Sequence, residues 1–522
     1  MKTISIRKIE FLQNSLSTTV AVFMLCVLPI VVNNGYFDIN TIKVTVFIKI
    51  MPWLAGAYLI MCVFNKKWPY RRFQERKVPF IFLGVLMISW LLSVIHAGFT
   101  SAVLLGNEGR YAGFFFLSCC ALGCFCIASG KTFERLLSFA IPVTGSFIAM
   151  LGFLNMLGMD PLHFYTDLVK EQRLAFLSTI GNINFYGCGL LVSLSVAASM
   201  WVCGKHAVFG LCNAVIIGIG IFCSITDTAL IGIVCSGPIL FYMMWGNTKA
   251  MHHAILYSMV CILLIPLTQQ ILLYNSKLYI EFPGLFAFMA KWFVWLPLLL
   301  FLGIVDYIVV HRVHKFQERP KIWALLLFFL LAGILILGTG MTIGKLHING
   351  EPFNEDEPAK LNFFELWGKR GFIYYASLRC FRNFSWDQKV FGCGVDNLRS
   401  VIEPYLYYSD RRMFKPGDYL NDVHNQPLQY LLTCGIIGCI AYTGFYICIL
   451  LIMCRKRETT SLSNGVLLYL LLNLPGFLLN VAQPILLIFF FGAAGIGLSC
   501  IYETNESIPH SKDAVGKIIP CE

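Results

Sequence analysis

The sequence predicts an all-α polytopic membrane protein with roughly 12–14 transmembrane helices. Hydrophobic residues make up 57% of its 522 residues, charged residues only 13%, and the mean hydropathy is +0.71. A globular domain in water does not carry so much apolar surface. The apolar residues also form runs long enough to cross a bilayer, and the basic residues gather in the short loops between these runs.

The apolar runs divide the chain into about fourteen predicted spans of about 20 residues each. They lie near 15–33, 44–64, 78–96, 111–129, 135–157, 183–203, 207–224, 227–245, 254–273, 284–310, 322–341, 427–453, 465–481 and 485–502. The short run at 465–481 and the crowded region 207–245 leave a lower count open. Four parts follow, namely an N-terminal bundle (1–341), a large extracytoplasmic loop or cap between helices 11 and 12 (342–426), C-terminal helices (427–502) and a tail (503–522).

Lysine and arginine residues mark the cytoplasmic side. They occupy alternate loops, as Lys66, Lys67, Arg71, Arg72, Arg76, Lys77, Lys131, Arg135, Arg312, Lys315, Arg319, Lys321, Arg455, Lys456 and Arg457. The positive-inside rule then places both termini in the cytoplasm and the 342–426 segment outside the cell membrane. The same distribution explains the net charge of +12 without a nucleic-acid partner.

The 20 cysteines do not indicate a disulfide scaffold, because most lie inside apolar runs, where they act as small hydrophobic residues. Cys380 and Cys393 fall in the large polar loop, where a disulfide and two free thiols are both open. No cysteine or histidine spacing resembles a zinc site, and we expect no metal.

The stretch Asp422–Gly438 joins a polar tetrapeptide to a long apolar helix. Asn425 suits an N-cap and Pro427 suits the first turn, so we expect a membrane helix from here to about Met453. His424 then lies at the membrane surface, where the positive end of the helix disfavours a charged imidazole and attracts phosphate. The alternative is an interfacial histidine that only ends a loop.

Two further basic clusters are predicted on the outer face. Arg110 precedes the fourth span, where it either contacts substrate or extends to lipid headgroups. Arg173 precedes a Gly-Asn-Ile-Asn helix start, in which Asn182 and Asn184 either cap the helix or help its free N–H groups to hold phosphate beside the arginine.

A third cluster lies in the large loop. Arg370 stands four residues before Tyr374, and Gly392 and Gly394 follow. The alternative for Arg370 is a surface salt bridge, for example with Glu365. The tyrosine-rich remainder of this loop suggests a folded, carbohydrate-facing surface rather than a linker.

These motifs together resemble the O-antigen ligase and polymerase superfamily of membrane glycosyltransferases. The resemblance rests on the His-Asn pair before Gly435-Ile-Ile-Gly438, the arginine before Gly-Asn-x-Asn, and the order arginine, aromatic, Gly-x-Gly, histidine. Tyr374 stands where the family usually has tryptophan. Thr226-Asp227-Thr228 stands where members often have Ser-Arg.

The resemblance implies a GT-C-like fold and a metal-independent, inverting transfer with no cofactor. The donor would be a glycan on undecaprenyl pyrophosphate, and the acceptor a hydroxyl of a glycan, lipid or protein. His424 would be the catalytic base, and Arg173 and Arg370, with Arg110 as a weaker candidate, would bind the pyrophosphate. The supporting residues would be Asn182, Asn184, Asp422, Asn425 and Tyr374.

The motifs favour a ligase, with a surface polysaccharide polymerase as the alternative, because both enzymes need the same clamp and base. A transporter of lipid-linked oligosaccharides should carry charges deep inside several helices, and most spans here are uncharged. A structural anchor for an assembly complex would not need His424.

Overall fold

The computed structural model describes residues 2–311 and 369–501, except for short gaps at 37, 66–76, 166–167, 205, 276–279, 281, 283, 406–419, 456–459 and 480–482. The main helices are α1 (Lys2–Val22), α2 (Ile39–Phe64), α4 (Lys77–Ala97), α6 (Phe114–Ser129), α7 (Glu134–Met156), α9 (Ile183–Val202), α10 (Ala207–Cys223), α11 (Asp227–Met243), α12 (Thr248–Asn275), α14 (Trp292–His311), α18 (Lys369–Asn383), α22 (Gln426–Arg455), α23 (Ser461–Leu472) and α25 (Pro484–Cys500). Shorter helices are α5 (Ser101–Leu105), α8 (Lys170–Arg173), α13 (Gly284–Met289), α19 (Trp386–Phe391), α20 (Arg399–Ile402) and α24 (Leu474–Leu479).

The described residues confirm an all-α, membrane-embedded protein. They include nine helices long and apolar enough to span a bilayer, and four shorter apolar helices, α6, α10, α11 and α25. Each of these matches a predicted span. The predicted span at 322–341 and much of the predicted 342–426 cap lie outside the described residues.

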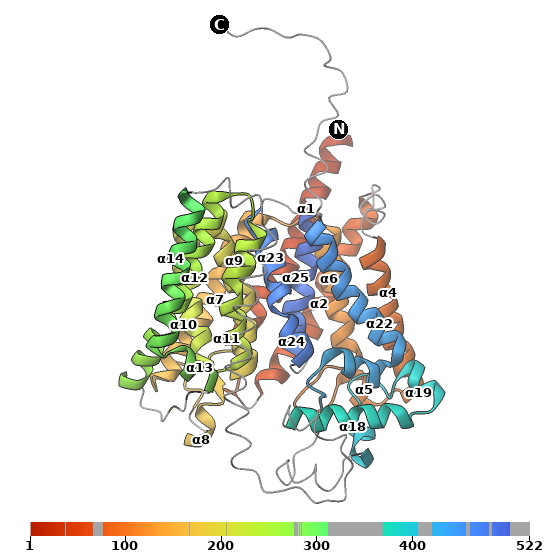
Figure 1. The fold of residues 1–522 in the computed structure, drawn as a ribbon. Coiled ribbons are helices and arrows are strands. Elements are labelled where there is room, and N and C mark those ends of the chain that lie inside the picture. Colours follow the sequence, from red (N-terminus) through yellow and green to blue (C-terminus); the bar gives the residue numbers. More distant parts are fainter. Residues whose placement is uncertain are drawn as a thin grey trace, which may run out of the picture.

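The helices run side by side, with α18 lying across one end of the bundle near α5 and α19 (Figure 1). The start of the chain projects from the opposite end. α9 and α25 form the centre, because almost all of their side chains are buried. Both are rich in glycine, alanine and serine, which lets neighbouring helices approach closely.

Two of the predicted spans are present, but each is divided into two helices. The run 284–310 is divided into α13 and α14 at Ala290 and Lys291, and the run 465–481 is divided into α23 and α24 at Asn473. Hydropathy gives little sign of such breaks, because both halves of each run are apolar.

α22 begins as predicted but contains a break at Gly435, whose φ of 69° and ψ of −171° are not helical. The break frees the carbonyls of Leu432 and Thr433, and these accept hydrogen bonds from the backbone N–H groups of Cys393 (2.9 Å) and Gly394 (3.1 Å). The Gly-x-Gly turn therefore docks onto the broken helix and brings the preceding α18–α19 segment against it.

A two-residue antiparallel hairpin, β1 (Phe176–Leu177) with β2 (Gly181–Asn182), leads into α9. Lys43 of α2 is 2% exposed, and its Nζ donates to the carbonyl of Thr179 in the hairpin turn at 2.8 Å and to that of Val31. This buried lysine ties the hairpin to the bundle.

Candidate functional site

Asn425 caps α22, as predicted. Its Oδ1 accepts from the backbone N–H of Leu428 at 2.9 Å, and Pro427 falls in the first turn. Its Nδ2 donates to the carbonyl of Leu478 at 3.0 Å, which ties the start of α22 to α24. The cap fixes the helix start directly after His424.

His424 is held by its backbone rather than by its ring. Its backbone N–H donates to Asp422 Oδ1 at 2.5 Å, and its carbonyl accepts from the Tyr374 hydroxyl at 3.1 Å. Its ring Nδ1 is buried and has no hydrogen-bond partner among the described residues. The described residues therefore leave the hydrogen-bonding capacity of this imidazole nitrogen unused.

The surroundings of His424 favour its neutral form. Burial lowers the pKa of His424 below its ordinary value, because loss of water penalises the charged imidazolium. The Asp422 carboxylate opposes this shift, whereas the positive charges of Arg370 and Arg110 add to it. A neutral histidine is the form that accepts a proton.

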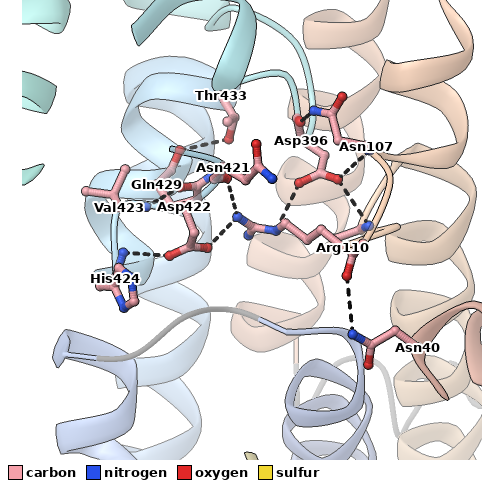
Figure 2. Close-up of polar contacts among 12 residues, drawn as sticks. Asn40, Asn107, Arg110, Asp396, Asn421, Asp422, Val423, His424, Gln429 and Thr433 are labelled. Atoms are coloured by element: carbon pink, nitrogen blue, oxygen red, sulfur yellow. Dashed lines mark hydrogen bonds and ion pairs between the residues drawn. The ribbon is translucent and has the colours of Figure 1, made fainter. Parts of the chain in front are cut away.

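Arg110 lies between two carboxylates (Figure 2). Its Nε is 2.9 Å from Asp396 Oδ1, and its Nη1 contacts Asp422 Oδ2 and donates to the carbonyl of Asn421 at 2.7 Å. The three charged side chains are only 6%, 1% and 8% exposed, for Arg110, Asp396 and Asp422 respectively. Arg110 therefore neither extends to lipid headgroups nor faces an open substrate site.

Asp396 is the most buried member of this cluster. Its Oδ2 accepts from the backbone N–H groups of Asn107 (2.9 Å) and Ala112 (3.2 Å), on either side of Arg110. Burial raises the pKa of Asp396 to about 6, although Arg110 opposes this shift. One arginine cannot fully compensate two buried carboxylates, which agrees with that direction.

A cavity of about 20 Å³ adjoins the ion pairs and is lined in part by Arg110, Asp396, Gln429 and Thr433. This volume suits a single water, not a sugar or a pyrophosphate. The side of the Arg110–Asp396 ion pair that faces this cavity therefore has no room for substrate.

Arg370 and Tyr374 come from the start of α18 and face the same region. Arg370 is half-buried and lies close enough to His424, Tyr374 and Asp227 for its charge to act on each of them. The structure thus brings Arg370, Tyr374, Asp422, His424 and Asn425 together.

Arg173 belongs to a separate cluster. Its guanidinium donates to the carbonyls of Leu168 and Tyr165, both at 3.4 Å, and lies 5.8 Å from the Tyr165 ring centroid. Asn182 caps α9 by accepting from the backbone N–H of Asn184 at 2.9 Å, so the capping interpretation holds. α8 lies at the same end of the bundle as α18 (Figure 1).

The sequence did not indicate Asp396 as a partner of Arg110. Asp396 lies 284 residues after Ala112, which is in the same loop as Arg110. No local sequence pattern relates residues so far apart. Cys380 and Cys393 are both buried free thiols. Within the described part of the chain, no group of three or more His, Cys, Asp or Glu side chains is placed to hold a metal ion.

The chain matches no family model, and no curated protein matches it significantly.

Proposed function

We propose that this protein is an O-antigen ligase-like glycosyltransferase that acts on lipid-linked glycans at the outer face of the cytoplasmic membrane. The observation that carries the proposal is the buried Nδ1 of His424, which has no hydrogen-bond partner among the described residues and lies within the influence of the positive charge of Arg370. The motif resemblance supplies the substrate class, and the site chemistry fits it.

In the proposed reaction, an acceptor hydroxyl attacks the anomeric carbon of a glycan on undecaprenyl pyrophosphate. The new C–O bond forms as the bond to the phosphate oxygen breaks, and the bonding electrons leave on the pyrophosphate. His424 takes the hydroxyl proton and later returns it to water. Attack opposite the leaving group inverts the anomeric centre.

The leaving pyrophosphate gains negative charge as the bond breaks, so nearby fixed cations stabilise the transition state. Arg370 suits this role because it is half-buried and close to His424. Arg173 is proposed as a second contact, from α8 at the same end of the bundle. We do not assign pyrophosphate binding to Arg110, because its guanidinium is already ion-paired with Asp396 and Asp422.

Deletion of the gene followed by sizing of the lipid-linked glycan tests the proposal. Long unattached chains indicate a lost ligase, whereas single repeat units indicate a lost polymerase, the second candidate. His424→Ala should reproduce the deletion while the protein still reaches the membrane. Normal glycan from this variant would exclude His424 as the base, and an accumulation of lipid-linked glycan on the cytoplasmic face would indicate a transporter.

Arg370→Lys should lower transfer by about tenfold or more, because lysine lacks the planar pair of donors that binds phosphate at two points. Arg173→Lys should behave likewise. The matched control is Arg382→Lys, an exposed arginine on the same helix as Arg370. Transfer at the control level by both test variants would contradict the phosphate role.

A further inference from the structure

The buried cluster of Arg110, Asp396 and Asp422 has no part in the proposed chemistry. It joins three loops, namely the one after α5, the Gly-x-Gly turn after α19 and the one before α22. Apolar side chains of similar volume would hold such loops together at least as well, because burying charges is costly. The charges therefore point to a requirement for one defined geometry.

That geometry centres on the backbone of His424. Its φ of 58° lies in the left-handed region, which is unfavourable for a residue other than glycine. The N–H of His424 donates to one oxygen of Asp422, and the other oxygen of Asp422 contacts Arg110. Figure 2 shows the resulting series of contacts, with Asp422 between Arg110 and His424.

We propose that Arg110, Asp396 and Asp422 are positioning residues that hold His424 in this backbone conformation and leave its ring free for substrate. This inference rests on the function proposed above. Asp422 alone would rotate at the tip of its loop, and Arg110 prevents this by holding its second oxygen. Asp396 in turn fixes Arg110, by binding Nε and the two backbone N–H groups that flank the arginine.

Other contacts support the same loop without touching the ring. The N–H of Val423 donates to Gln429 Oε1 at 3.0 Å, and the hydroxyl of Tyr374 donates to the carbonyl of His424. Polar side chains therefore hold the backbone both before and after the Cα of His424. Misplacement of a reacting group by about 1 Å lowers a rate by as much as a hundredfold.

Arg110→Lys is the first test, because it keeps the charge but replaces a guanidinium that contacts both carboxylates with a single ammonium. We expect kcat to fall by about tenfold or more with little change in KM, since substrate contacts remain. Arg382→Lys is the control. Wild-type kcat in Arg110→Lys would overturn the proposal.

Arg110→Lys also risks misfolding, so Asp396→Asn, which leaves one cation facing one anion, provides a second test. It should reach the membrane in normal amount and still lower kcat more than KM. An unchanged kcat in this variant would likewise overturn the proposal.

Reaction with diethyl pyrocarbonate, which modifies neutral imidazole, provides a readout that needs no substrate. The full-length protein in nanodiscs is treated across a pH series, and modification of His424 is followed by mass spectrometry. The groups that act on His424 are Asp422, Arg370 and Arg110. Asp422→Asn removes the charge that raises the pKa of His424, so the midpoint of modification should move to lower pH, while the other histidines serve as internal controls.

An unchanged midpoint and rate at His424 in Asp422→Asn would overturn the positioning role whatever the enzyme does. Full glycan transfer by His424→Ala would instead overturn the proposed function. Loss of transfer in His424→Ala together with wild-type transfer in Arg110→Lys would keep the function and reject the positioning residues. The double variant Arg110→Lys/His424→Ala should be no worse than His424→Ala alone, because both changes act through the same ring.

Discussion

The contribution of Asp396 to the stability of the fold depends on pH. Its pKa in the folded protein is about 6, above the ordinary value of 3.8, so the folded state binds its proton more tightly than the unfolded state does. The stability that this proton supplies is fully present below pH 3.8 and is lost as the pH rises to about 6. Above that pH Asp396 is ionised beside Arg110.

Asp396→Asn removes this titration. The difference in apparent melting temperature, wild type minus variant, should therefore increase as the pH falls from 7 towards 4. Thermal unfolding in detergent measures this difference. The heating rate is kept fixed, because membrane proteins seldom unfold reversibly and the apparent melting temperature then depends on the rate. A difference that stays constant with pH would show that Asp396 remains ionised throughout.

The break in α22 and the Gly-x-Gly turn form one joint. An added Cβ at Gly435 would lie 2.1 Å from the carbonyl oxygen of Val390, and one at Gly392 would lie 2.2 Å from that of Thr433. Both contacts are with backbone, which cannot move aside easily. Both glycines also have positive φ, so the joint requires them for conformation and for space.

Gly435→Ala should lower the free energy of unfolding by about 2 kcal/mol or more, because alanine fits neither the positive φ nor the space. It should also reduce transfer, because the joint supports the loop that contains Asp396, the partner of Arg110. Gly84→Ala in α4 is the control, because its Cβ meets nothing within 4 Å and alanine is the better helix former. Apparent melting temperatures of both variants check this. Equal stability of Gly435→Ala and the control would mean that α22 can straighten.

Local chemistry explains what the sequence could predict. Apolar runs predicted the spans that the structure describes, and the N-caps Asn425 and Asn182 followed from side chains that bond to their own helix starts. The contact of Arg110 with Asp396 and Asp422 could not be predicted, because a single sequence does not show which distant loops meet. The break at Gly435 was hidden for a related reason, since its compensating N–H groups come from residues 393 and 394.

The candidate site and the start of the chain lie at opposite ends of the bundle (Figure 1). Asp387 in α19 is at the site end, and Lys249 at the start of α12 is at the other end; both are exposed. The positive-inside rule predicts that the basic loops, and with them Lys249, face the cytoplasm. The proposed reaction requires the site end to face outward, where the lipid-linked donor is presented.

Asp387→Cys and Lys249→Cys, each in a background without other reactive thiols, should therefore react with a membrane-impermeant maleimide from opposite sides. In intact cells only the Asp387→Cys protein should be labelled, and Lys249→Cys should be labelled after the membrane is permeabilised. Removal of the background cysteines must first be shown to leave the protein in the membrane. Labelling of Lys249→Cys alone in intact cells would place His424 on the cytoplasmic side, where an outer-leaflet glycan could not reach it. Labelling of both variants from the same side would contradict the arrangement of the bundle itself.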